Sequence, residues 1–282
     1  MNKIFYIILS SFFVLAIGVA ALWYFNGQNQ SSEEVTEFWQ AHNPSSNTII
    51  DHSQWQEILD EYLITDDDSG VYLVDYELLS EDPTLLNDYI NYLTQLAPKD
   101  YNKNEQMAYW INLYNALTVQ LIVSHYPLES ITDLGESTLS FGPWDDIITT
   151  VSAQPLSLNH IEHSILRPIW QDPRIHFAVN CASIGCPNLQ GTAFTGDNLD
   201  TLLNQGAQDY LNHERGLTLD EEDNTLYLSS IFKWYAEDFG ADEAAVITAL
   251  ANYLADGDLK DQLTSFDGNV SYDYNWQLNE IQ

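Results

Sequence analysis

Basic residues are scarce in this sequence. Eight Lys and Arg stand against 42 Asp and Glu, which gives the 282-residue chain a formal net charge of −34. A protein that binds the phosphate backbone of DNA or RNA needs a positive stripe or patch, and the sequence contains no such cluster. We therefore expect no nucleic-acid partner. Hydrophobic residues make up 45% of the chain, so its acidity indicates a charged surface on a folded protein rather than general disorder.

One N-terminal stretch lacks charge altogether. Lys3 precedes Ile4–Phe25, a run of about 22 uncharged and mostly apolar residues. A helix of that length rises about 33 Å, which is enough to cross the hydrocarbon core of a bilayer. With Lys3 on the cytoplasmic side and Trp23 in an interfacial aromatic belt, we predict a transmembrane anchor over residues 1–25. A cleaved signal peptide is the alternative, and either form exports the rest of the chain.

The exported part is predicted to be a short spacer followed by one folded domain. Residues 26–44 are polar, as expected for a linker, and residues 45–282 carry the apolar patterns of a globular domain. We expect this domain to be anchored at the inner membrane and to face the periplasm or the exterior, or to be secreted after cleavage. We expect no cofactor.

Apolar periodicity predicts more helix than strand. Helices are predicted at 52–63, 81–97, 104–127, 157–170, 197–213 and 242–255, and strands at 70–79, 174–180, 216–229 and 269–276. The 104–127 segment is apolar almost all round, so we expect it to be the buried central helix. The short apolar run at 174–180 favours a buried strand. Together these patterns predict a helix-rich, single α+β domain around a small sheet.

Cysteine occurs only twice, and both residues fall in one short stretch. The sequence RIHFAVNCASIGCPNL, residues 174–189, places Cys181 and Cys186 just after the predicted strand. A thiol becomes a nucleophile when a neighbouring group lowers its pKa or takes its proton. In an oxidising compartment the same pair can instead close a small disulfide loop. Gly185 and Pro187 predict a tight turn over 182–186, whose backbone N–H groups could face a developing oxyanion.

Four sequence blocks resemble the domain of unknown function 547 family. They are YWINLYNALTV (109–119), LSLNHIEHSILR (156–167), RIHFAVNCASIGCPNL (174–189) and LYLSSIFKWYAEDF (226–239). The blocks appear in the family order and cover residues 100–240. Positions that match the family pattern are Asn112, Asn115, Glu162, His163, Arg167, His176, Cys181, Cys186, Pro187, Trp234, Tyr235 and Asp238. The resemblance implies little about activity, and a distant relation to papain-like or transglutaminase-like thiol hydrolases is a further expectation.

From the cysteines and these blocks we hypothesise a cysteine-dependent acyl-transfer hydrolase, such as a peptidase, an amidase or a transglutaminase-like enzyme. Cys181 would be the nucleophile, and His163, on the preceding predicted helix, would be its base. His176 is only a secondary candidate for the base. On a strand its side chain would point to the opposite face from Cys181, and five extended residues would separate the two by about 17 Å. Asp238 or Asn112 would orient the imidazole.

Substrate contacts are expected from residues of the same blocks. The candidates for substrate binding are Arg167, Glu162, Asn115 and Trp234. Arg167 lies one helical turn after His163 on the same face, and it can hold a substrate carboxylate through two parallel hydrogen bonds. The substrate class stays open between a small molecule and a peptide.

A non-catalytic module is the alternative from another class. In that case a Cys181–Cys186 disulfide locks the loop, and the membrane-tethered domain serves as a binding or scaffold module. Cys186 is otherwise a secondary candidate for thiol chemistry. A metal site is a weak alternative that would use His160 and His163, at i and i+3 on one predicted helix face. Because their spacing matches no zinc signature, we expect no metal site.

Overall fold

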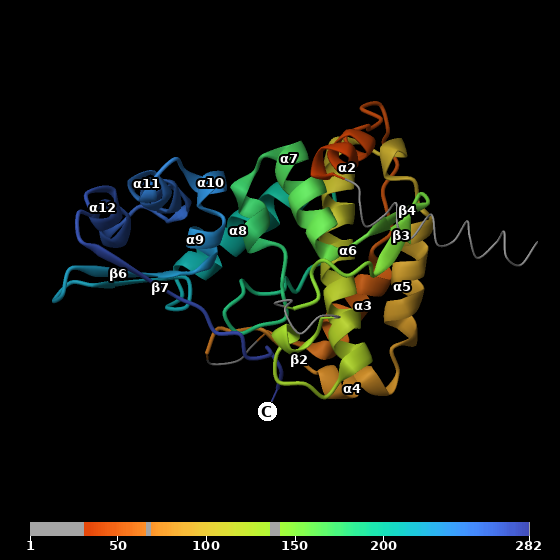
Figure 1. The fold of residues 1–282 in the computed structure, drawn as a ribbon, viewed down its shortest axis with the longest axis horizontal. Coiled ribbons are helices and arrows are strands. Elements are labelled where there is room, and N and C mark those ends of the chain that lie inside the picture. The colour runs from red at the N-terminus through yellow and green to blue at the C-terminus, as the bar shows by residue number, and fades with distance from the viewer. Residues whose placement is uncertain (1–30, 66–68, 136–141, 282) are drawn as a thin grey trace, which may run out of the picture.

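The computed structural model describes residues 31–65, 69–135 and 142–281. These residues form a helix-rich α+β fold with small sheets, as the sequence predicts (Figure 1). The predicted membrane segment, residues 4–25, lies outside the described residues. Within the described ranges, no helix combines the length and the apolar character that crossing a bilayer requires.

Helices supply most of the regular structure. The α-helices are α2 (Ser32–Trp39), α3 (Ser53–Tyr62), α4 (Tyr76–Glu81), α5 (Thr84–Gln95), α6 (Lys103–His125), α7 (Arg167–Trp170), α8 (Leu199–Leu211), α9 (Ile231–Trp234), α10 (Ala236–Phe239), α11 (Glu243–Tyr253) and α12 (Asp258–Thr264). A π-helix, His160–Leu166, leads directly into α7, and short 3-10 turns lie at Pro98–Asp100, Ile131–Asp133 and Pro173–Phe177.

The strands form three small sheets. They are β1 (Leu63–Ile64), β2 (Leu73–Val74), β3 (Thr149–Val151), β4 (Gln154–Leu156), β5 (Leu217–Asp220), β6 (Thr225–Ser229) and β7 (Asn269–Asp273). β1 pairs with β2 and β3 with β4, each antiparallel. The third sheet has the order β5-β6-β7, in which β6 is antiparallel to β5 and parallel to β7. The predicted hairpin over 216–229 and the predicted strand near 269–276 are therefore confirmed.

Helix α6 is the centre of the larger hydrophobic core, as predicted. Asn102 begins it by accepting hydrogen bonds from the backbone N–H groups of Asn104 and Glu105, both at 3.1 Å. Every residue from Glu105 to Val119 is buried, because α4, α5 and the π-helix pack around it. A helix that is apolar on all faces has no face suited to solvent, so packing on every side is its stable arrangement.

The folded body begins earlier than the predicted linker boundary. Residues Ser32–Trp39, within the 26–44 segment, form α2, which Ser31 and Glu34 start with a reciprocal capping box. Val35 and Trp39 lie one turn apart and are buried, and the Trp39 ring meets the edge of Trp110 at 4.9 Å. The polar composition of this stretch hides two apolar anchors at helical spacing, which is enough to dock a short helix.

A second hydrophobic cluster is built around α11 and the β5-β6-β7 sheet. In Figure 1 it occupies the left of the view, away from the helices around α6. Helix α8 joins the two clusters, because Leu202 and Leu203 belong to the larger one while Tyr210 and Leu211 belong to the second.

The predicted strand at 174–180 is wrong. Pro173–Phe177 forms a 3-10 turn, started by Asp172, which accepts the N–H of Arg174 at 3.0 Å. Proline early in a turn is pre-set for helical geometry, and apolar periodicity over so few residues does not separate a strand from a buried turn. The argument from strand alternation and extended length that set His176 apart from Cys181 therefore does not apply.

Two other predictions are corrected in part. Of the strand expected over 70–79, only Leu73–Val74 is extended, and Asp75 then caps α4 by accepting the N–H of Leu78. The helix expected over 157–170 exists, but His160–Leu166 is a π-helix. Its wider turn joins the Arg167 N–H to the Glu162 carbonyl, five residues back.

Candidate functional site

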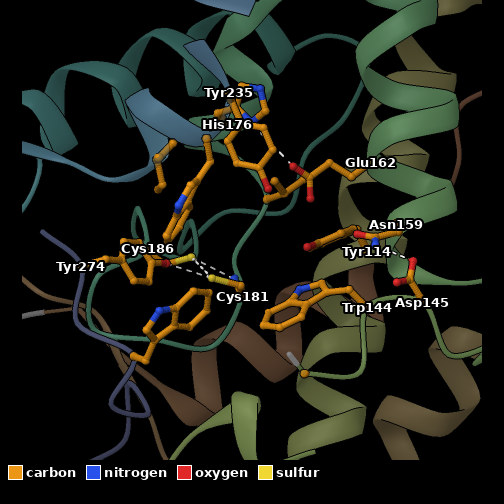
Figure 2. A pocket seen from close by; sticks show the side chains of 15 residues that line it. Tyr114, Trp144, Asp145, Asn159, Glu162, His176, Cys181, Cys186, Tyr235 and Tyr274 are labelled. Carbon is orange, nitrogen blue, oxygen red and sulfur yellow. Dashed lines mark hydrogen bonds and ion pairs between the residues drawn. The ribbon is translucent and has the colours of Figure 1, made fainter. Parts of the chain in front are cut away.

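Both cysteines line a pocket of about 650 Å³. Its walls come from segments far apart in the sequence: Tyr114 from α6, Glu162 from the π-helix, Trp234 from α9 and Tyr274 just after β7. Figure 2 shows Tyr274 and Trp144 on opposite sides of the two sulfur atoms, with Glu162 and Tyr235 nearer the top of the view. The volume lies within the range of small-molecule sites.

The two thiols are in direct contact. The Sγ atoms of Cys181 and Cys186 lie 2.6 Å apart, and both cysteines are free. The Cys181 backbone N–H donates to Cys186 Sγ at 3.0 Å. The hydroxyl of Tyr274 lies 3.0 Å from Cys181 Sγ and 2.9 Å from Ser183 Oγ. Cys181 is partly exposed to the pocket, whereas Cys186 is only 3% exposed.

A dense hydrogen-bond network holds the cysteine loop. Asn115, from α6, donates to the Ala178 carbonyl and accepts the Asn180 N–H, both at 2.9 Å. Asn180 in turn accepts the Ala182 N–H and donates to the Pro187 carbonyl, both at 2.8 Å. These bonds fasten the loop at both ends, so the cysteines sit on a rigid support.

Close backbone packing explains the glycine of this loop. A Cβ on Gly185 would lie 2.8 Å from the Asn275 nitrogen and 2.9 Å from its carbonyl oxygen. The Gly185 N–H donates to that carbonyl, at 2.8 Å. The segment after β7, which carries Tyr274, can therefore approach the cysteine loop only where the side chain is absent.

The surroundings of Cys181 and Cys186 favour a state in which the two sulfurs together carry one negative charge and share one proton. Burial alone would raise the pKa of Cys186, but hydrogen bonds from the Cys181 thiol, the Tyr274 hydroxyl and the Cys181 N–H lower it. The hydrogen bond to Cys186, together with burial, raises the pKa of Cys181 well above its ordinary value. The first proton thus leaves the pair readily and the second is retained.

A buried arginine stands behind the loop. Arg215 donates to the Ile184 carbonyl at 3.1 Å and to Asn188 Oδ1 at 2.5 Å, one on each side of Cys186. Its guanidinium lies over the Tyr210 ring at 5.6 Å. Burial lowers the pKa of Arg215, while interactions with Tyr210 and then Cys186 raise it. Arg215 therefore holds the loop on both sides of Cys186.

Both ring nitrogens of His176 face carboxylates. Nε2 lies 2.6 Å from Asp238 Oδ2, and Nδ1 lies 3.6 Å from Glu162 Oε1. The ring is buried and stacks on Tyr235 with centroids 4.2 Å apart. Arg167 also binds Asp238, through Nε at 2.5 Å and Nη2 at 3.0 Å. His176 lines the pocket, but its nitrogens are engaged away from the thiols.

His163, the predicted base, lies outside the pocket lining. Arg167 Nη1 lies 3.0 Å from His163 Nδ1, so the predicted proximity of these two residues is confirmed. Burial lowers the pKa of His163, and the Arg167 charge adds to this effect while Glu162 opposes it. Among the described residues, no hydrogen bond joins a histidine ring to either sulfur. Arg167 pairs with Asp238 and Glu237, and it does not line the pocket.

The remaining candidates divide between structure and pocket. Asn112, buried on α6, exchanges hydrogen bonds with the backbone of Phe194, at 2.7 and 3.1 Å, and not with a histidine. Trp234 lines the pocket and is 48% exposed. His160 Nδ1 accepts the Ser157 N–H at 3.1 Å. In the part of the chain that the structure describes, no group of three or more His, Cys, Asp or Glu side chains is placed to hold a metal ion.

Of the backbone N–H groups expected to form an oxyanion hole, those of residues 182 and 184–186 are already engaged in hydrogen bonds. Those of Ile184 and Gly185 donate to the carbonyls of Gln277 and Asn275, both at 2.8 Å. The Cys186 N–H donates to the Ser183 carbonyl at 3.0 Å. The turn uses the Ile184 and Gly185 donors to hold itself against the C-terminal segment, and the hydroxyls of Tyr274 and Ser183 lie beside Cys181 Sγ.

With this geometry in place, comparison with known proteins gives one match. Residues 98–211 match the family described as "Protein of unknown function, DUF547". This part of the chain is a DUF547 region. The match covers α6, the π-helix and the cysteine loop, so the DUF547 resemblance is confirmed for the first three sequence blocks, while the fourth block, residues 226–239, lies outside the matched range. No curated protein and no solved structure matches the chain, and the papain-like or transglutaminase-like relation stays a prediction.

Sequence reasoning missed three residues at the thiols: Ser183, Arg215 and Tyr274. Ser183 lies between the two cysteines in the sequence, and that position was the only feature that pointed to it. Tyr274 and Arg215 come from outside the DUF547 region, and no local pattern linked them to the cysteine loop.

Proposed function

We propose that this protein is an exported, thiol-dependent acyl-transfer enzyme whose nucleophile is Cys181. The observation that carries the proposal is a pair of free thiols, 2.6 Å apart, on the wall of a substrate-sized pocket. Cys181 is the partly exposed residue of the pair and Cys186 the buried one, so we assign Cys181 as the nucleophile. The pocket suits a small molecule or the end of a peptide.

Cys186 is the general base in this proposal, in place of the histidine that we expected from the sequence. Cys181 Sγ bonds to the carbonyl carbon of an amide while its proton passes to the Cys186 thiolate, and the carbonyl oxygen becomes an oxyanion. The C–N bond then breaks, and the leaving amine takes the proton back from Cys186. Water repeats the cycle on the thioester: its proton moves to Cys186, the C–S bond breaks, and the acid leaves as Cys181 recovers the proton.

Two hydroxyl groups support the oxyanion. The hydroxyls of Tyr274 and Ser183 lie 3.0 and 3.5 Å from Cys181 Sγ, close enough to donate to an oxyanion that forms there. Burial and the charge of the two sulfurs raise the pKa of Tyr274 well above its ordinary value, so its hydroxyl keeps the proton that it donates. Asp238 and Arg167 act at a distance, by holding His176 and thereby one wall of the pocket.

The closeness of the sulfurs also favours a second candidate. A disulfide between Cys181 and Cys186 would lock the loop and make the domain a binding or scaffold module without thiol catalysis. For either candidate, we propose that residues 4–25 attach the domain to the inner membrane, on its outer side.

Acylation of the thiol by a chromogenic ester separates the two candidates. With p-nitrophenyl acetate, the reduced protein should release a burst of nitrophenol and carry an acetyl group on Cys181, mapped by mass spectrometry. Cys181→Ser should abolish the burst. Cys186→Ser, which removes the proton acceptor of the proposed mechanism, should slow the nitrophenol burst by at least about tenfold. Tyr274→Phe, which keeps both thiols, serves as the matched variant for the oxyanion and should slow acylation without abolishing labelling.

Failure has a clear signature. If the reduced protein forms no acyl adduct on Cys181, acyl transfer is refuted. If the native protein also has a mass two hydrogens lower than the reduced form, the disulfide-locked module takes its place.

A further inference from the structure

The pocket walls combine aromatic faces with carboxylates and lack strong cations. Its aromatic lining residues are Tyr114, Trp144, Trp234, Tyr235, Tyr274 and Trp276. Its acidic lining residues are Glu162, inside, and Asp145, which is exposed. Among the described residues that line it, none is Lys or Arg. This composition is selective, because it offers negative charge and π-faces to a ligand and no Lys or Arg side chain to pair with an anion.

The aromatic side chains form a continuous wall. Trp276 stacks on Trp234 at 5.6 Å and contacts Tyr274 at 4.6 Å, and Trp144 meets Trp276 edge-on at 5.6 Å. Gly142 keeps Trp144 in place: its φ is +80°, and a Cβ there would fall 1.9 Å from the indole ring. Trp234 leaves 48% of its surface exposed. The rings are therefore held in position before any ligand arrives.

Glu162 is the carboxylate inside this wall. Its side chain is 5% exposed and forms a hydrogen bond with Tyr235, while His176 Nδ1 lies 3.6 Å away on a ring whose Nε2 is 2.6 Å from Asp238. Arg167, the closest arginine on the same helical segment, is paired with Glu237 and Asp238. In Figure 2 the Glu162 carboxylate lies between Tyr235 and Tyr114. Among the described residues no Lys or Arg forms an ion pair with Glu162, so a ligand cation would stabilise this buried carboxylate.

We propose that the pocket binds an organic ammonium group, as the cationic end of a small amine or a quaternary ammonium compound. The positive head would lie against the indole faces, which attract cations, with Glu162 supplying the opposite charge. The net charge of −34 adds a long-range attraction for cations. The inference names the ligand class of the pocket in which the proposed acyl transfer occurs, and in that sense it rests on the proposed function.

Choline and its neutral carbon isostere test the inference. Binding is measured by calorimetry and by quenching of tryptophan fluorescence on Cys181→Ser protein, which cannot form an acyl adduct. Choline should bind at least about tenfold more tightly than the isostere, because the two differ only in charge. Glu162→Gln and Trp234→Leu should each weaken choline binding by about fivefold. Trp170→Leu is the matched control, since Trp170 packs near Lys103 outside the pocket.

Equal binding of choline and its isostere overturns the inference, and so does a preference for a neutral sugar such as glucose or an unchanged affinity in Trp234→Leu. The two proposals fail separately. If choline does not bind but the reduced wild-type protein forms an acyl adduct on Cys181, the ammonium site is refuted and acyl transfer is not. If choline binds but no acyl adduct forms, acyl transfer is refuted and the ammonium site is not.

Discussion

Replacing Asp238 by asparagine tests whether the polar wall of the pocket depends on one carboxylate. Asp238 accepts from Arg167 Nε at 2.5 Å and Nη2 at 3.0 Å, and it lies 2.6 Å from His176 Nε2. Burial alone would raise the pKa of Asp238, but these hydrogen bonds and charges hold it well below its ordinary value. Asparagine keeps the shape of the side chain and removes the charge, so the variant isolates the electrostatic part.

The expected loss is about 2–3 kcal/mol in the free energy of unfolding. Breaking a fully buried pair costs about 3–5 kcal/mol, because the partner is left with an uncompensated charge. Asp238 is 24% exposed, and Arg167 keeps its contact with Glu237, so the cost is discounted for solvent screening. Urea unfolding at neutral pH measures it. Asp256→Asn, which removes a surface ion pair with Lys260, is the matched control and should leave stability unchanged.

The pH dependence of this difference has a definite sign. Because the folded pKa of Asp238 is depressed, its contribution is fully present above the unfolded value of about 4 and declines as pH falls below it. The gap between wild type and Asp238→Asn should therefore be constant from pH 7 to about pH 5 and narrow toward pH 2. A gap below about 0.5 kcal/mol at pH 7, or one that widens in acid, would refute the reasoning.

Two further predictions concern the core. Burial lowers the pKa of His52 to about 4, so the unfolded chain takes up a proton near pH 6.5 that the folded chain refuses. About 3 kcal/mol of stability should be lost as pH falls from 6.5 to 4, and His52→Gln should flatten that slope in urea unfolding; an equally steep slope in the variant would contradict this. Asn115→Ala leaves the Ala178 carbonyl and the Asn180 N–H without their partner, and should cost about 2–4 kcal/mol and loosen the cysteine loop. Hydrogen exchange at Asn180 checks this, and unchanged protection there would count against it.

The spacing of apolar residues predicted the secondary structure correctly where a segment's own composition determines it. The spacing of apolar residues over 104–127 predicted α6 to within two residues at each end, since a helix buried on every side needs only its own composition. It failed at 174–180, where a proline-led turn and a buried strand have similar sequences. It also failed at residues 32–39, where two apolar side chains in a polar stretch were enough to dock a helix.

The sequence by itself determined that two cysteines share one short loop and that the chain contains a DUF547 region, because both properties reside in contiguous residues. Only the tertiary structure decided what the sulfurs touch. Tyr274 reaches Cys181 from 93 residues away and Arg215 braces the loop from outside the matched region, while both histidines proposed as bases turn to Arg167 and Asp238. The chemistry of a thiol follows from its neighbours in space, and chain folding chooses those neighbours from segments that carry no mutual signal in the sequence.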